Sequence, residues 1–427
     1  MIDLFITDIS LNVYACVYFL LYVASYIVYS RKIGSFKNIN ATQFLILYFC
    51  IASLLSLIYL NISNGLFRDY SNLSLPPYLY LFVCFCISLV PIYKYDNTII
   101  EQIDISEKQD TIIRKTCVLI CLCTLLPFLE SLLQIPAAMA KDDSLANAYD
   151  SRLDGNISDY LSFFGRKFFA IVWMLNNLIP PFLFLSIIKK YDKKIIILLG
   201  ISLATIWLHA MVLGGRSKLV QNALYLLFNY FLFKGYLDEK IKTKITFYGS
   251  ILFSVAVLAV AAVSISRFNT TYADTSSAMD SIWAWLGLYA GEGTLNFNCW
   301  EWEIKGSTNG YMTMSVLLSL LDGHAVTVEE LWRLGDKLGI PGNNFFTYVG
   351  DIYKDFGRFG TVLFILILAT LTRKMSEPKI KTINIKKLIY LSLWAKILVI
   401  GPIFYTYGAY ADQQNLLVAI IYCLFLL

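Results

Sequence analysis

The sequence predicts an all-α polytopic integral membrane protein with about eleven transmembrane helices and one large extracytoplasmic loop. Of its 427 residues, 58% are hydrophobic and only 15% are charged, and the mean hydropathy is +0.62. A soluble protein of this size carries about a quarter charged residues. The apolar residues fall in runs of about 20, each long enough to cross about 30 Å of hydrocarbon. Basic residues gather between alternate runs, as they do in membrane proteins.

Eleven apolar segments are expected to span the bilayer. Eight precede residue 266 and three follow residue 357, so the chain divides into helices 1–8 (residues 1–265), a large loop (266–357) and helices 9–11 (358–427). The first segment is expected to remain as a span, because the N-terminus lacks the basic residues of a signal peptide. The predicted spans are residues 11–30, 43–62, 77–93, 116–134, 168–187, 195–213, 217–234, 245–265, 355–372, 388–406 and 411–427.

The basic residues set the expected orientation. Five alternate connections hold 21 of the 35 Lys and Arg residues, and the opposite connections hold 13 over more than twice the length. Because basic loops stay in the cytoplasm, we expect the N-terminus and the 266–357 loop outside and the C-terminus in the cytoplasm. The net charge of +5 then reflects topology rather than nucleic-acid binding. With only two histidines and with cysteines mostly inside spans, neither a metal site nor a disulfide is expected.

A tight turn between the sixth and seventh predicted spans is a candidate anion site. It reads Gly214-Gly215-Arg216-Ser217-Lys218. Glycines let the backbone approach a ligand closely, and Arg216 stands at a helix start, where free N–H groups and the helix dipole favour an anion. A guanidinium can grip a phosphate through two hydrogen bonds. The alternative is a surface turn whose cations meet lipid headgroups.

Arg267 lies just past the eighth predicted span and is the second candidate. A single arginine at this level is commonly a snorkelling anchor. Together with Arg216, and with Lys218 nearby, it would form a clamp for a diphosphate.

The third candidate is Glu292, within the segment Tyr289-Ala290-Gly291-Glu292-Gly293-Thr294-Leu295-Asn296-Phe297. Glycines around it would admit a substrate, and apolar neighbours would raise the pKa of its carboxyl towards the range of a general base. The alternative is a glycine turn with an exposed glutamate.

Aromatic residues are concentrated in the same loop. Sugar rings pack on flat side chains, and Asn296, Asn298 and Glu301 could bind hydroxyls beside them. An aromatic belt at the membrane surface predicts the same enrichment. Five of the eight tryptophans lie here: Trp283, Trp285, Trp300, Trp302 and Trp332.

The fourth candidate segment, residues 341–360, leads into the ninth predicted span. Asp351, Lys354, Asp355 and Arg358 recur three to four residues apart and are expected on one helical face. We expect Asn344, Tyr353, Lys354 and Arg358 to bind the substrate, together with Lys218, Tyr289, Asn296 and Trp300. The alternative is a self-neutralising ladder of charges that ends a membrane helix.

These motifs resemble those of the Wzy-type O-antigen polymerases, which join oligosaccharide repeat units. The resemblance rests on the number of spans, the late outer loop, Gly-Arg after span six, and an Asn-Xaa-Phe-Thr … Asp-Phe-Gly-Xaa-Xaa-Gly ending, here Asn344, Phe346, Thr347, Asp355, Phe356, Gly357 and Gly360. It implies a fold like that of the GT-C-like membrane glycosyltransferases. It also implies a metal-independent, cofactor-free enzyme in the bacterial inner membrane that makes O-antigen of lipopolysaccharide or capsule.

The resemblance implies a polyprenyl-diphosphate-linked oligosaccharide, such as one on undecaprenyl diphosphate, as substrate. The resemblance also allows a chain-length regulator protein as a partner. On this interpretation Arg216 and Arg267 hold the leaving diphosphate. The resemblance assigns no base, so Glu292 is the first candidate from its local chemistry alone, with Asp351 or Asp355 as the second. An O-antigen ligase and a transporter or flippase of lipid-linked oligosaccharide are the alternatives.

Overall fold

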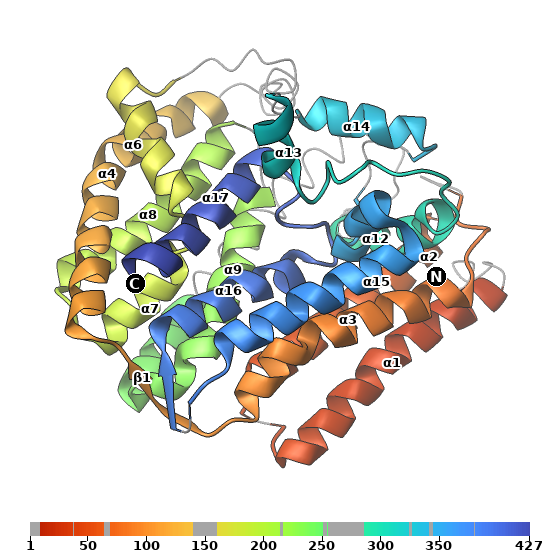
Figure 1. Ribbon diagram of the computed structural model, residues 1–427, viewed down its shortest axis with the longest axis horizontal. Coiled ribbons are helices and arrows are strands. Elements are labelled where there is room, and N and C mark those ends of the chain that lie inside the picture. The colour runs from red at the N-terminus through yellow and green to blue at the C-terminus, as the bar shows by residue number, and fades with distance from the viewer. Residues whose placement is uncertain are drawn as a thin grey trace. The chain divides into compact units, whose positions relative to one another are not determined.

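The computed structural model describes residues 9–36, 38–63, 69–139, 160–213, 217–250, 254, 286–323, 327–340, 345–379 and 381–427. These residues form helices, with one small sheet (Figure 1). The chain divides into two compact units. Unit 1 comprises residues 1–98, 244–377 and 394–413, and unit 2 comprises residues 99–243, 378–393 and 414–427. The predicted outer loop, residues 266–357, therefore falls in unit 1.

Long apolar helices form most of unit 1. α1 (Ile9–Ile33), α2 (Ala41–Ser63) and α3 (Leu75–Asp96) pack against one another, and α15 (Tyr348–Ser376) packs along α3 (Figure 1). Prolines stand in the first turn of α3, where a missing N–H costs no helical hydrogen bond. Aromatic rings fill the space between the first three helices, with Tyr22 against Phe49 and Phe85.

Several short helical segments of unit 1 lie between α3 and α15 in the described sequence. They include α12 (Glu292–Asn296), the π-helical turn η3 (Phe297–Glu301), α13 (Ser315–Asp322) and α14 (Val328–Lys337). α14 begins with a capping box in which the Thr327 and Glu330 side chains bond each other's backbone N–H groups.

Unit 2 is a second group of packed helices. α4 (Glu107–Met139) packs against α6 (Phe163–Met174) and α8 (Lys193–Val212), and the Thr124 and Ser202 hydroxyls join α4 to α8 at 2.7 Å. The remaining elements of the unit are α7 (Ile179–Ile188), α9 (Ser217–Phe233) and η2 (Lys234–Tyr236).

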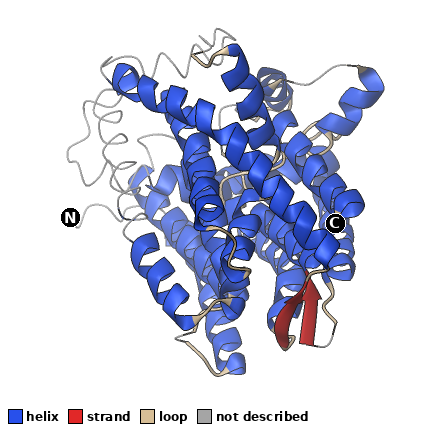
Figure 2. Cartoon of the chain, turned by 90° about the vertical axis from the view of Figure 1, so that its left-hand side faces the viewer, coloured by secondary structure: helices blue, strands red, loops and turns tan. Residues whose placement is uncertain are grey.

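Unit 2 also contains the two strands, so the all-α expectation needs one amendment. β1 (Ile100–Asp104) and β2 (Lys381–Asn384) are parallel and appear red in Figure 2. Ile103 pairs with Ile383, and the register shifts between Ile100 and Gln102.

The last three elements are α16 (Ile385–Ile400), α17 (Tyr410–Ile421) and the π-helical turn η4 (Tyr422–Leu426). The division between the units falls inside α16 after Leu393 and inside α17 after Gln413.

Among the described residues, six helices are long and apolar enough to cross a membrane: α1, α2, α3, α4, α8 and α15. The predicted class, a membrane protein with helical spans, is supported to this extent. The predicted single span at 168–187 instead consists of α6 and α7, which meet at 74°. Pro180 and Pro181 begin α7 and have no N–H to bond back to α6, so the helix cannot continue. Most of the predicted span at 245–265 lies outside the described residues.

Candidate functional site

The polar start of α15 is the centre of the candidate site. The helix begins at Tyr348, seven residues before the predicted span at 355–372. Thr347 caps it, and its hydroxyl accepts a hydrogen bond from the Gly350 amide at 3.2 Å. The first two turns carry Asp351, Lys354 and Asp355, which are all buried within unit 1.

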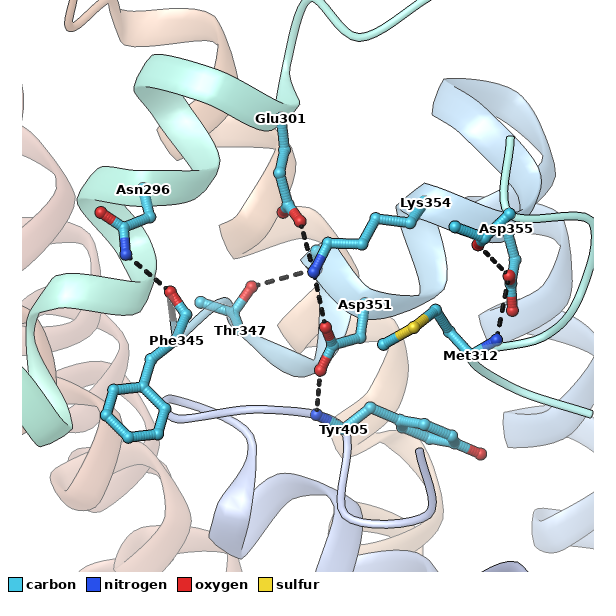
Figure 3. Close-up of polar contacts among 11 residues, drawn as sticks. Asn296, Glu301, Met312, Phe345, Thr347, Asp351, Lys354, Asp355 and Tyr405 are labelled. Atoms are coloured by element: carbon cyan, nitrogen blue, oxygen red, sulfur yellow. Dashed lines mark hydrogen bonds and ion pairs between the residues drawn. The ribbon is translucent and has the colours of Figure 1, made fainter. Parts of the chain in front are cut away.

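Lys354 joins two carboxyl groups from different elements. Its Nζ lies 3.0 Å from Oε1 of Glu301 in η3 and 3.0 Å from Oδ1 of Asp351, which approach it from opposite sides in Figure 3. The ammonium also lies 3.8 Å from the centre of the Phe346 ring. The second oxygen of Asp351 accepts a hydrogen bond from the Tyr405 amide at 2.7 Å. We call Glu301, Asp351 and Lys354 the charged trio.

The trio holds two carboxyl groups and one cation. The pKa of Glu301 is raised to about 8, mainly by burial and to a smaller degree by the charge of Asp351, and this value already includes the opposing effect of the Lys354 ammonium. Near neutral pH most of the Glu301 carboxyl is therefore protonated, so the trio is close to neutral, and the smaller ionised fraction can accept a proton. Oε2 of Glu301 accepts no hydrogen bond from any described residue. This oxygen lies against Gly350, where an added Cβ would stand 2.1 Å from it.

Asp355 faces a different partner, the loop of residues 307–314. Both of its oxygens accept hydrogen bonds from that loop (Figure 3). The donors are the Thr308 hydroxyl, the Gly310 amide at 3.0 Å, the Met312 amide at 3.2 Å and the Thr313 hydroxyl at 2.6 Å. This geometry gives Asp355 the role of holding the loop, while its proposed role as a base stays a prediction.

Arg358 does not share the helical face of the trio, and the expected four-residue ladder is wrong at this point. Gly357 adopts φ 64° and ψ −170°, which breaks α15 and turns the following residues. The Arg358 guanidinium stacks on Trp302 instead, 3.8 Å from the ring centre. Tyr353, a predicted substrate-binding residue, donates its hydroxyl to the Trp302 carbonyl at 2.9 Å.

Glu292 is 1% exposed, so the alternative of an exposed glutamate in a glycine turn is wrong. The flanking glycines face other parts of unit 1 rather than open space. A Cβ on Gly291 would stand 2.6 Å from the backbone of Ser56 in α2, and one on Gly293 would stand 2.8 Å from the Pro402 carbonyl oxygen. We expected these glycines to admit a substrate, but the group that lies close to each of them is the chain itself.

The Gly291→Ala variant is expected to destabilise the protein by about 1–3 kcal/mol, the usual cost of overpacking a filled site. The new methyl group would meet the Ser56 backbone, which cannot rotate away. Thermal unfolding of the purified protein measures the effect. Gly200→Ala in α8 is the control, because nothing lies within 4 Å of its Cβ position. Equal melting temperatures for the two variants would contradict the close packing of α12 on α2.

Three other predicted substrate-binding residues, Tyr289, Asn296 and Trp300, contact Tyr70 or Phe345. Asn296 donates its side-chain amide to the Phe345 carbonyl at 2.8 Å and accepts the Tyr70 hydroxyl at 3.1 Å (Figure 3). The Trp300 ring lies 5.5 Å from that of Tyr70, and the Tyr289 ring lies 5.1 Å from that of Phe345. Tyr289, Asn296 and Trp300 therefore help to hold the segments around the trio.

The predicted diphosphate clamp cannot be located. Arg216, Arg267 and Asn344 lie outside the described residues, as do Trp283 and Trp285. Lys218 belongs to unit 2, where its Nζ lies 5.2 Å from the Trp173 ring centre. In the part of the chain that the structure describes, no group of three His, Cys, Asp or Glu side chains could hold a metal ion.

Comparison with protein-family models, with curated proteins and with solved structures gave no significant match. Function must therefore be argued from the residues. Glu301 was expected only to bind a hydroxyl, and its pairing with Lys354 was missed. The i, i+3 spacing of Asp351 and Lys354 is visible in the sequence, but no local pattern connects Glu301 to them. The arrangement can take up and release a proton close to neutral pH.

Proposed function

We propose that this chain is a membrane glycosyltransferase that joins polyprenyl-diphosphate-linked oligosaccharide repeat units into O-antigen or capsular polysaccharide. The charged trio is the observation that supports this proposal most directly, because glycosyl transfer to a hydroxyl needs a group that accepts a proton near neutral pH. The eleven-span topology in a bacterial cytoplasmic membrane, with the N-terminus outside, is part of the proposal.

In the proposed reaction, the acceptor hydroxyl oxygen forms a bond to the anomeric carbon of the donor sugar. The bond from that carbon to the lipid diphosphate breaks, and the diphosphate leaves with the electron pair. Arg216 and Arg267, with Lys218, stabilise the growing negative charge. The hydroxyl proton passes to a buried carboxylate: Glu292 is the first candidate, Asp351 or Asp355 the second, and the ionised form of Glu301 a further one. Attack from the face opposite the diphosphate inverts the anomeric centre.

The length of surface glycan tests the two carboxylates. In a host strain that lacks the gene, Glu292→Gln or Glu301→Gln is expected to abolish long chains and leave single repeat units attached, because the amide cannot accept the proton. Glu239→Gln, whose side chain is 87% exposed in unit 2, is the matched control and should restore the full ladder. A normal ladder in both variants would remove these carboxylates from the reaction.

The same assay tests the clamp. Arg216→Ala and Arg267→Ala, at normal expression, are each expected to shorten or abolish the ladder. An unchanged ladder in both variants would refute the clamp.

One alternative has structural support. A transporter of lipid-linked oligosaccharide would use buried ionisable groups and broken helices, and the protein has the trio, the 74° bend between α6 and α7, and the break at Gly357. Loss of a transporter would leave no glycan outside the cytoplasmic membrane, whereas loss of a polymerase leaves single units there. An O-antigen ligase would differ again, since its loss leaves long polymer unattached.

A further inference from the structure

α15 changes character at Gly357. The residues before the break are mostly buried and include the charged Asp351, Lys354 and Asp355, whereas those after it expose an apolar stripe along one face. Phe359 is 89% exposed and Leu363 is 58% exposed, and the stripe continues through Leu366, Ile367 and Leu371. In a membrane helix, such a stripe faces lipid. The apolar part, from Phe359 to Thr372, is about 20 Å long at 1.5 Å per residue, so it occupies only part of the bilayer thickness.

Arg358 stands at one end of this apolar part of α15, and Arg373 and Lys374 stand at its other end. The Cζ of the Arg358 guanidinium lies over the Trp302 ring, 3.8 Å from the ring centre, and the guanidinium donates to the Trp302 carbonyl at 3.3 Å. Oε1 of Glu303 lies 3.7 Å from Nη2 of Arg358, and the Glu303 side chain is 83% exposed. The Arg358 side chain is itself 45% exposed, so part of its donor fork faces outward.

We propose that Arg358, held on Trp302, binds the phosphate of a lipid embedded in the membrane. A phosphate at this level would meet the guanidinium while the hydrocarbon chain ran down the stripe that begins at Phe359. The lipid is identified as the polyprenyl diphosphate carrier, an identification that rests on the proposed function. Arg358 is held by Trp302, the residue after Glu301 of the trio, so the proposed lipid site and the trio share the segment that ends in η3.

Lipid binding to the purified full-length protein tests this site. Native mass spectrometry or a fluorescence titration would compare a polyprenyl diphosphate with phosphatidylglycerol and phosphatidylcholine. Arg358→Gln is expected to weaken diphosphate binding by about tenfold, the scale of one lost charge-assisted contact. Arg373→Gln, at the other end of α15, is the matched control and should leave diphosphate binding unchanged.

Two further variants guard against a folding defect. Arg358→Lys keeps the charge and should recover part of the affinity. Glu303→Gln removes the competing anion and should tighten binding by about two- to threefold. Loss confined to the diphosphate identifies the lipid carrier, and equal loss with phosphatidylglycerol identifies bulk anionic phospholipid as the source of the phosphate. Unchanged affinity for both lipids in Arg358→Gln overturns the site.

The glycan assay separates this inference from the proposed function. Weaker diphosphate binding by Arg358→Gln, together with a transporter phenotype for the gene deletion, would keep the site and reject the polymerase. A polymerase phenotype together with unchanged binding would reject the site and keep the function.

Discussion

Lys354→Met is expected to destabilise the folded protein by about 3–5 kcal/mol, the usual cost of removing one partner from a buried ion pair. Lys354 is 7% exposed, and its ammonium pairs with both Glu301 and Asp351. Without it, the Asp351 carboxylate would stay buried and, among the described residues, keep the hydrogen bond from the Tyr405 amide. Thermal unfolding in detergent and the yield of monodisperse protein measure the loss.

Two other variants distinguish the loss of the Lys354 charge from the loss of Lys354 packing. The double variant Lys354→Met with Asp351→Asn should recover much of the stability, because the amide at position 351 carries no charge and the Glu301 carboxyl, without the ammonium beside it, stays protonated. Lys190→Met is the matched control. It removes a lysine that also faces a carboxylate, at 3.7 Å from Asp238, but its side chain is 76% exposed and the cost should be below about 1 kcal/mol. If Lys354→Met melts like Lys190→Met, the trio does not stabilise the fold.

Hydropathy located the long helices because each must present an apolar surface over its whole length. The bounds of α1, α2, α3, α4 and α8 enclose or nearly match the predicted segments. Hydropathy does not locate the breaks within or between these helices. An apolar window treats α6 and α7 as one span, and it does not register that Gly357 divides α15 into a polar and an apolar half.

The candidate site was predictable only where its contacts are local. Asp351 and Lys354 are three residues apart on one helix, and their ion pair follows from that spacing. Glu301 lies 53 residues before Lys354 in the chain, and only the packing of η3 against α15 brings them together. The glycines around Glu292 are a similar case, because the sequence indicates that something approaches closely but does not identify the backbone of α2.

The stability of the protein is expected to fall as pH rises from about 5 to above 8. The pKa of Glu301 is raised from its ordinary value of 4.5 to about 8 by burial. Between these values the folded state holds a proton that the unfolded state has released, so acidic pH favours folding. The contribution is complete below about pH 4.5 and is lost as the pH passes through 8. Melting temperatures measured from pH 5 to 9 give the slope.

Glu301→Gln isolates this contribution from the other titrating groups. The amide cannot ionise, and Lys354 is then paired with Asp351 alone, so the variant should show a flatter profile and melt above the parent at pH 9. Glu239→Gln, at an exposed position, should keep the parental slope. A slope that is the same in all three proteins would mean that Glu301 is ionised throughout. The trio would then carry a net negative charge, and Glu301 would lose its role as the group that exchanges a proton near neutral pH.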